Sequence, residues 1–356
     1  MQKRIVYFDV LRAISISAVI ILHLSAVYFQ TDVNSFTWEI SSILNSLSRY
    51  AVPVFVMISG ALFLNPSTEI NIKKLYSKNI KHILTALVFW SFCYSSAIFL
   101  FGADRGNISK SFENLIFGYT HLWFLYMIAG LYIIVPFLRT ICRDKQLVCY
   151  FLIISIIFSF LPTTITKILT GLDISFPACG FNRFASGLVL LINERFCFHF
   201  TMGYAAYFVL GYYAHSAVFS RFQRILIYCS GICGWLFTVL FTSFVSHKLN
   251  APFEIFHPMN LNVALQALAV FVFFKYNTCM LPAWTTSLCT RLSEYIFGIY
   301  LVHAGLQACI LKFLDIYTIS INPVYIFIPA VMIIFLLSWI ITAVIKHIPF
   351  VNRHIV

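Results

Sequence analysis

Long apolar runs recur along the whole of this sequence and limit what it can fold into. Ten of them are long enough to cross the roughly 30 Å of bilayer hydrocarbon as helices. They fall near residues 10–29, 46–64, 82–101, 121–138, 147–165, 199–216, 225–245, 258–276, 293–314 and 323–345. The chain is 61% hydrophobic and only 10% charged, whereas a soluble domain has about 25% charged residues. The sequence therefore predicts an all-α, polytopic membrane protein, a bundle of about ten transmembrane helices.

The apolar runs also predict the domain organisation. The first run, near 10–29, is too long for a signal-peptide core and lacks a small-residue cleavage site, so we interpret it as a retained span. The spans reach almost to the C-terminus without a linker or a low-complexity tract. We therefore expect one integral-membrane domain over residues 1–356, with no appended soluble domain.

Positive residues are distributed unevenly over the connections between spans. With a cytoplasmic N-terminus, fifteen Lys and Arg residues fall in cytoplasmic segments and eight in outer segments, and Arg12 lies within the first span. Because cytoplasmic loops carry the excess of Lys and Arg, this bias places both termini in the cytoplasm. The same rule explains the net charge of +12 without a nucleic-acid partner.

The first span, RAISISAVIILH from Arg12 to His23, carries ionisable groups at both ends. Eleven residues on an α-helix bring two side chains to within about 20° of one face and about 16 Å apart along the axis. Asp9 precedes Arg12 by three residues and can pair with it. Two interpretations stay open. The polar stripe lines a water-accessible reaction path, or Arg12 snorkels to the cytoplasmic surface while His23 lies near the outer headgroups.

The types of these residues suit a transfer reaction. A neutral imidazole such as that of His23 accepts a proton from a hydroxyl near physiological pH. A guanidinium such as that of Arg12 binds an anionic donor group through charge-assisted hydrogen bonds. We therefore expect His23 and Arg12 to be the catalytic pair.

Further polar residues begin other spans or connections. Arg49 starts the second run in SRYAVPVFVMISG, which also carries Ser59. The first cytoplasmic connection, NIKKLYSKNIKH, includes Lys78 and Lys81. Membrane topology alone predicts basic residues in that connection, and a docking surface for a nucleotide phosphate is the alternative.

Two later segments add candidates for the acceptor side. His121 and Trp123 open the fourth run in HLWFL, where Trp123 is either an aromatic-belt residue or a sugar-stacking one. Tyr300 and His303 lie three residues apart in the ninth run and share a helix face. His303 is either a functional imidazole or an ordinary buried histidine with a hydrogen-bonding neighbour.

The longest outer connection, 166–198, mixes aromatic and hydrogen-bonding residues around Arg183. It is either an element that recognises the acceptor or an ordinary connection. Cys179 and Cys197 bracket this stretch on an oxidising side and could form a disulfide. Cys229 and Cys233 lie four residues apart without a nearby His or acid, so we expect no metal site.

Four segments together resemble the membrane acyltransferase 3 family. They are FDVLRAISISAVIILH, SRYAVPVFVMISGALFL, HLWFLYMIAGLYIIVPFLR and EYIFGIYLVH, which occur in the family's order. The first is the most specific, because it carries the family's arginine and histidine as Arg12 and His23. The chain looks most similar to the compact members that acetylate O-antigen or enterobacterial common antigen sugars.

The resemblance implies a ten-helix acyltransferase in the bacterial inner (cytoplasmic) membrane. An acetyl group from cytoplasmic acetyl-CoA would pass to a sugar hydroxyl of a lipid-linked or polymeric glycan, such as O-antigen, at the outer side. Arg12 and His23 would be essential, and we expect the donor to be held by Asp9, Arg49, Ser59, Lys78 and Lys81. The acceptor pocket would comprise His121, Trp123, Arg183, Tyr300 and His303.

The chain departs from the family at one motif. Many relatives carry R-x-x-R in the first cytoplasmic connection, where this chain has Lys78 and Lys81 at the same spacing. Lysine keeps the charge but loses the bidentate fork of arginine. If the motif binds the phosphates of CoA, this protein differs from those relatives in its affinity for CoA or in its choice of acyl donor.

Two other functions remain open at this point. O-succinyl transfer remains possible, because the sequence does not reveal the size of the acyl pocket. A transporter or flippase for a glycan, lipid or solute would also have about ten helices with buried ionisable groups. Against transport, the sequence shows no inverted repeat and no pair of Gly/Pro-broken spans in matching positions.

Overall fold

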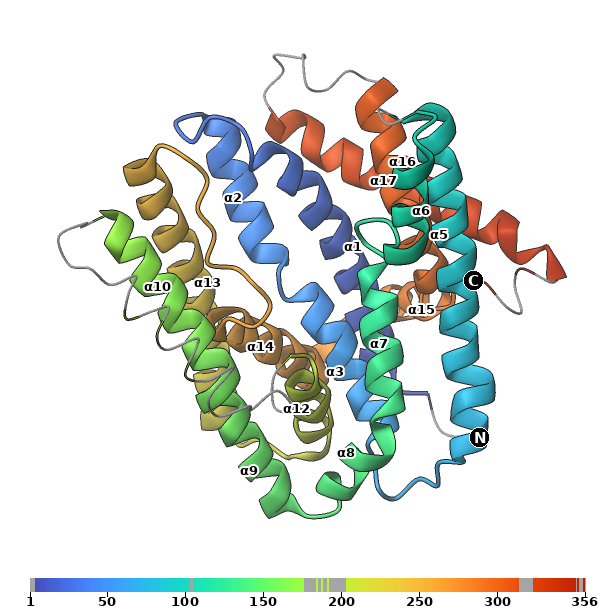
Figure 1. Cartoon of the computed structure of the whole chain (residues 1–356). Helices are drawn as coiled ribbons and strands as arrows, with labels where there is room; N and C mark the ends of the chain where they lie inside the picture. The colour runs from blue at the N-terminus through green and yellow to red at the C-terminus, as the bar shows by residue number, and fades with distance from the viewer. Residues whose placement is uncertain are drawn as a thin grey trace. The chain divides into compact units, whose positions relative to one another are not determined.

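Every regular element is a helix in the residues that this computed structural model describes (Figure 1). These are residues 4–102, 105–175, 184, 187, 191, 203–313, 323–349, 351 and 355. Seven candidate spans are long and apolar enough to cross a membrane, and the count reaches nine if each of two bent helix pairs is one span. The chain is thus all-α with several membrane spans, and the expected ten are not all present in this described part.

The chain divides into two compact units. One comprises Met1–Asn65, Arg139–Ser293 and Ile321–Val331, and the other Pro66–Leu138, Glu294–Ser320 and Met332–Val356. The helices of the first unit are α1 (Val6–Tyr28), α2 (Phe36–Ser48), α3 (Ala51–Phe63), α9 (Lys145–Ser155), η2 (Ile156–Phe160), α10 (Leu161–Ser175), α12 (Ala205–Ser216), α13 (Arg221–Leu249), α14 (Leu261–Asn277), η6 (Thr278–Met280) and α15 (Ala283–Leu292). Those of the second are α4 (Ile72–Lys74), η1 (Leu75–Ile80), α5 (Lys81–Phe101), α6 (Ile108–Phe117), α7 (Trp123–Ile133) and α16 (Ile296–Phe313). Two helices contribute to both units, α8 (Val135–Cys142) and α17 (Pro323–Lys346).

The first span, α1, is a single unbroken helix from Val6 to Tyr28. Arg12 and His23 both lie on it, so the helical spacing expected from the sequence applies. They therefore lie on nearly the same face, about 16 Å apart along the axis.

The second span is a broken helix. α2 ends at Ser48, α3 begins at Ala51, and the pair forms one candidate span of 28 residues. Pro53 explains the break, because it has no N–H for the carbonyl of Arg49 four residues earlier and its ring crowds that carbonyl. The break lies near the middle of the span, where backbone groups need polar partners from the protein.

Proline also marks a break in α7–α8, where Pro136 removes the N–H that would bond to the carbonyl of Tyr132. The two prolines Pro53 and Pro136 therefore each mark a break between two consecutive helices. In both cases the proline lies in the first turn of the following helix, where a missing N–H is tolerated.

α12 replaces the sixth expected span with a shorter helix. Its 12 residues extend only about 18 Å at 1.5 Å per residue, and residues 199–202 lie outside the described part. α12 packs along α3 through two glycines. A Cβ on Gly60 would lie 1.8 Å from the Phe208 carbonyl oxygen, and one on Gly211 would lie 2.0 Å from that of Met57. Only glycine permits this approach of two helix backbones.

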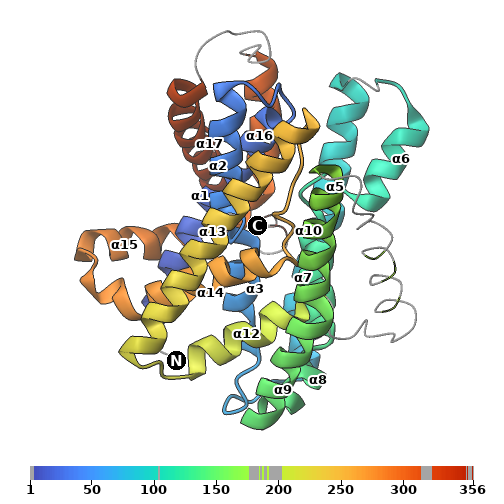
Figure 2. The same cartoon turned by 90° about the vertical axis from the view of Figure 1, so that its left-hand side faces the viewer.

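Some hydrogen bonds within the first unit link two connecting segments. Because successive spans cross the membrane in alternate directions, the linked segments are expected on the same side of it. Asn34, after α1, donates to Oδ1 of Asn250, after α13, at 3.0 Å. At the opposite end of α1, Arg4 donates to the carbonyl of Thr290 at 2.6 Å. α13 also packs against both α2 and α14 (Figure 2).

Candidate active site

Asp9, in the first turn of α1, binds two arginines. Its carboxylate accepts hydrogen bonds from Nε of Arg4 at 2.7 Å and from Nη1 of Arg12 at 3.2 Å. Arg4 also donates to the carbonyl of Thr290 and to Oγ of Ser293, each at 2.6 Å. The predicted pairing of Asp9 with Arg12 is confirmed, whereas the role of Arg4 was missed. The Asp9 side chain is 3% exposed and that of Arg12 is 31% exposed, so a buried carboxylate orients an accessible guanidinium.

Arg49 lies at the break between α2 and α3 and is held by two neighbours. Its Nε donates to Oδ1 of Asn45 at 2.7 Å, and its guanidinium carbon lies 3.9 Å from the centre of the Phe256 ring. Asn45 in turn donates from Nδ2 to Oγ of Ser25 at 3.1 Å and to the carbonyl of Leu22 at 3.4 Å. The break in the second span is therefore joined to α1 through one buried amide.

His23 lies beside this network. Its position on α1 falls between Leu22 and Ser25, the two residues that Asn45 contacts. The imidazole is partly exposed and lies within electrostatic range of Arg49. An accessible base next to a fixed cation is suited to proton transfer where negative charge develops.

Sequence reasoning missed the segment that joins α13 to α14, residues 250–260. Glu254 and His257 in this segment are exposed. The charge of Arg49 interacts with Glu254, and that of His257 interacts with Glu254, Lys167 and Arg49. The available signal was slight, namely two ionisable residues in the otherwise apolar stretch APFEIFHPMN.

His121, Tyr300 and His303 lie together in the second unit. The ring of His121 is centred 5.5 Å from that of Tyr300 and 5.3 Å from that of His303. The Tyr300 hydroxyl donates to the carbonyl of His121, and Nδ1 of His303 hydrogen-bonds to the carbonyl of Tyr300 at 2.7 Å. Their exposed fractions are 1%, 7% and 0%. These three residues form a buried cluster, which suits positioning better than direct contact with a large acceptor.

Two tyrosines extend the cluster. The ring of Tyr94, on α5, is centred 5.1 Å from that of His121 and is stacked on Tyr119 at 4.8 Å. Its hydroxyl donates to the carbonyl of Leu301 at 2.7 Å. By contrast, Trp123 is 41% exposed at the start of α7, which agrees with either a membrane-belt or a sugar-stacking role.

Lys78 and Lys81 lie at a π-helical turn. The turn, η1, joins α4 to α5, and it contains Lys78 and ends just before Lys81. Both lysines are exposed. π-Helical turns often occur at functional sites, and two exposed cations three residues apart can meet one anion.

Of the remaining candidate residues, the structure describes Ser59 but not Arg183, Cys179 or Cys197. Ser59 lies on α3 and is partly exposed, next to the glycine that contacts α12. Arg183, Cys179 and Cys197 lie outside the described residues, so the acceptor role of Arg183 and the disulfide stay predictions.

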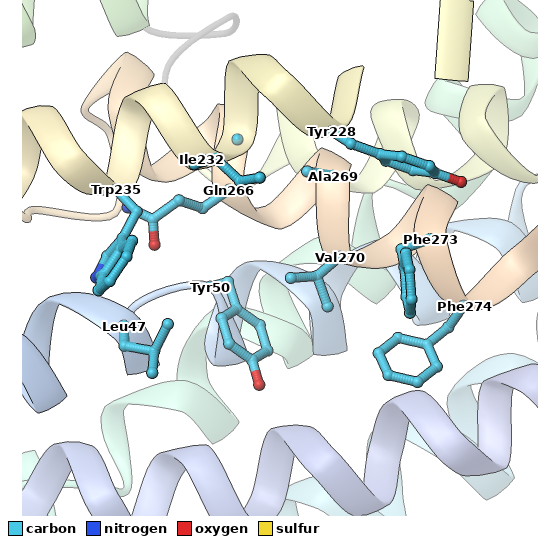
Figure 3. A pocket seen from close by; sticks show the side chains of 11 residues that line it. Leu47, Tyr50, Tyr228, Ile232, Trp235, Gln266, Ala269, Val270, Phe273 and Phe274 are labelled. Carbon is cyan, nitrogen blue, oxygen red and sulfur yellow. The ribbon is translucent and has the colours of Figure 1, made fainter. Parts of the chain in front are cut away.

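An apolar cavity of about 250 Å³ adjoins Tyr50, the residue after Arg49 (Figure 3). Side chains of α2, α13 and α14 form its walls, including Leu47, Trp235 and Phe273. The amide of Gln266 also reaches it, and none of the described residues that line it is a cation. The cavity therefore suits an apolar chain and not the phosphates of a nucleotide.

Among the described residues, no group of three His, Cys, Asp or Glu side chains could hold a metal ion. Comparison with curated proteins and with solved structures gave no match. The profile of a family described as an acyltransferase domain, acyltransferase 3, matches residues 5–343. That match spans nearly the whole chain, including the stripe on α1 and the segment that carries His303. The chain belongs to the membrane acyltransferase 3 family, and it is an acyltransferase of several membrane-spanning helices.

Proposed function

We propose that this acyltransferase moves an acetyl group from cytoplasmic acetyl-CoA to a sugar hydroxyl of an envelope glycan. The acceptor is O-antigen or a similar surface polysaccharide, or its lipid-linked precursor, and the enzyme works in the inner membrane of a bacterium. The termini lie in the cytoplasm, and residues 1–356 act as one membrane domain.

The observation that carries this proposal is that His23 and Arg12 share helix α1 and that His23 lies beside Arg49 of the second span. A donor inside the cell and a hydroxyl outside it must meet across about 30 Å of hydrocarbon. α1 offers a cation near one end and an imidazole about 16 Å further along, so one helix serves both substrates.

The chemistry follows from these positions. His23 accepts the proton of the acceptor hydroxyl as its oxygen attacks the thioester carbonyl. The resulting oxyanion is stabilised by the cation of Arg49, which Asn45 and Phe256 hold in place. The C–S bond then breaks, the protonated His23 returns its proton to the CoA thiolate, and the products are an ester and free CoA.

In this proposal, cationic side chains bind the acyl donor, acetyl-CoA. Arg12, oriented by Asp9, holds the anionic part of the donor. Lys78 and Lys81 contribute to CoA phosphate binding by charge, because both are exposed. Ser59 is a further donor-side contact.

On the acceptor side, Trp123 stacks on a sugar ring and Arg183 contributes hydrogen bonds. The buried cluster of His121, Tyr300 and His303 acts as a positioning element. Its side chains hold the N-terminal half of α16 against the start of α7 within the second unit.

The test is mass spectrometry of surface glycans from cells that lack the protein, complemented with wild type, His23→Gln or His247→Gln. His247 is a matched control, because it is a histidine of the same unit paired with Glu39. An acetyl increment restored by wild type and His247→Gln but not by His23→Gln supports the proposal. Restoration by His23→Gln removes His23 from the chemistry and makes His303 the next candidate base.

The same experiment separates the alternative functions. A succinyl increment in place of acetyl would change the donor and keep the mechanism. Unmodified glycans with reduced surface export would contradict the proposal in favour of transport.

A covalent route through an acetyl-His23 intermediate is the alternative to direct attack. Rapid quenching of purified protein with labelled acetyl-CoA and no acceptor separates the two. Label retained on His23 contradicts direct transfer, and label recovered only in acetyl-CoA contradicts the covalent route.

A further inference from the structure

The non-helical segment between α13 and α14, residues 250–260, is fixed by side chains along its length. Figure 1 shows it running from the end of α13 back to the start of α14. Four side chains from four helices hydrogen-bond its backbone, namely Ser246 of α13, Thr163 of α10, Tyr207 of α12 and Asn262 of α14. Because the backbone is held at this many points, the directions of its side chains are defined.

Side chains in this segment are divided between the protein interior and an accessible face. Phe253, Ile255 and Phe256 are buried, at 8%, 0% and 0% exposed. Glu254 and His257 are exposed. The anchored backbone therefore presents one carboxylate and one imidazole together.

The accessible face lies at the break in the second span. The guanidinium of Arg49 stacks on Phe256 at 3.9 Å, and its charge interacts with those of Glu254 and His257. Arg49 is near the middle of a 28-residue span, where a charged group facing lipid would cost at least about 2.5–3.5 kcal/mol. Arg49 therefore needs polar surroundings such as the Glu254 carboxylate, and so does non-helical backbone at this depth.

One hydrogen bond of His257 determines which of its ring nitrogens can donate to a ligand. The backbone N–H of Met259 donates to its Nδ1 at 3.2 Å, so the proton of the neutral ring is on Nε2. Partial burial lowers the pKa of His257, the positive charges of Lys167 and Arg49 act in the same direction, and Glu254 opposes them. The segment thus offers a hydrogen-bond donor, Nε2–H, beside an acceptor, the Glu254 carboxylate.

We propose that residues 250–260 are the acceptor-recognition element, in which Glu254 and His257 hydrogen-bond neighbouring hydroxyls of a polyhydroxylated acceptor. One hydroxyl donates to the carboxylate, and another accepts from Nε2–H of His257. A third hydroxyl of the same acceptor then lies at His23. This assignment rests on the proposed function and names the residues that select the acceptor.

The test compares Glu254→Ala and His257→Asn with a matched pair, Glu39→Ala and His247→Asn. Asn at 257 keeps an acceptor for the Met259 N–H and removes the Nε2–H donor. The control residues are also a Glu and a His of the same unit, and Nε2 of His247 lies 3.5 Å from Oε1 of Glu39. Glu254→Gln is added as a variant of unchanged shape.

Two quantities are measured, with the amount of protein in the membrane as normalisation. One is the acyl occupancy of surface glycans in complemented cells, and the other is the affinity of each purified variant for acetyl-CoA by calorimetry. Loss of a hydrogen bond to a charged group lowers occupancy about tenfold in the Glu254 variants, and loss of the neutral Nε2–H donor lowers it about two- to tenfold in His257→Asn. The control pair keeps wild-type occupancy, and all variants keep wild-type affinity for acetyl-CoA.

Wild-type occupancy in the Glu254 and His257 variants would overturn this assignment and leave the proposed function intact. A lower affinity for acetyl-CoA in the same variants would also overturn this assignment, because the segment would then bind the acyl donor. Absence of any acyl group on glycans of wild-type cells would overturn the proposed function and this assignment together.

Discussion

Arg49 donates from Nε to Oδ1 of Asn45 across 2.7 Å, and this bond holds the guanidinium at the break in the second span against the residue that contacts the first span. Asn45 is 0% exposed, and its amide group donates to Oγ of Ser25 and to the carbonyl of Leu22 on α1. One side chain therefore sets the position of Arg49 relative to the helix that carries His23.

Replacement of Asn45 with Ala is expected to lower acyl transfer about tenfold or more and to destabilise the protein by about 1–3 kcal/mol, because buried partners lose their hydrogen bonds. Ser48→Ala is the control, because Ser48 is also buried on α2 and its hydroxyl donates to the carbonyl of Leu44 in the same helix. Transfer rate per folded protein and thermal unfolding in detergent are the measurements. Equal transfer by both variants would contradict a role for Asn45 in holding Arg49.

Gly60→Ala is expected to destabilise the protein by about 1–3 kcal/mol or more, because overpacking forces backbones apart. The new Cβ would lie 1.8 Å from the backbone oxygen of Phe208, which cannot rotate away. Gly130→Ala is the control on α7, where a Cβ meets nothing within 4 Å. It should be neutral or slightly stabilising, because Ala favours the helix by about 1 kcal/mol. Similar melting temperatures for both variants would show that α3 and α12 tolerate separation.

Local features of the fold could be predicted from the sequence because short-range physics decides them. The run after Arg12 fixes α1, and the i, i+3 spacing fixes the pairing of Asp9 with Arg12, which the structure confirms. The break at Arg49 was also within reach, because Pro53 removes the hydrogen bond that would close the helix there.

Features that depend on distant residues could not be predicted. His121 and His303 are far apart in the sequence, and only the packing of α7 and α16 within the second unit brings their rings to 5.3 Å. The exposure of Glu254 results from anchors on four other helices, which no local pattern encodes. α12 begins only after Gly203, which has φ of 79°, whereas hydropathy alone predicted a full span there.

Arginine at positions 78 and 81 is expected to tighten acetyl-CoA binding by about two- to tenfold, because a guanidinium binds phosphate with two parallel hydrogen bonds and an ammonium with one. Lys73→Arg with Lys74→Arg is the control, because these exposed lysines belong to the same connection but precede the π-helical turn. Calorimetry at two salt concentrations measures both pairs. The same affinity in both double variants would favour the interpretation that these lysines serve membrane topology.

Stability between pH 7.5 and 5 is expected to depend on His257. Partial burial lowers the pKa of His257 from its ordinary value of 6.5. The unfolded chain therefore binds a proton at a higher pH than the folded chain does, and the free energy of unfolding decreases as the pH falls below about 6.5. The decrease ends once the pH is below the folded pKa, because both states are then protonated.

His257→Asn removes this contribution, so its melting temperature should vary less with pH than that of wild type over the same range. All other titrating groups are shared and cancel in the difference between the two proteins. His247→Asn, at the histidine that pairs with Glu39 in the same unit, should keep the wild-type slope. A slope as steep in His257→Asn as in wild type would mean that His257 has the same proton affinity in both states, so that Glu254 would offset the effects of burial, Lys167 and Arg49.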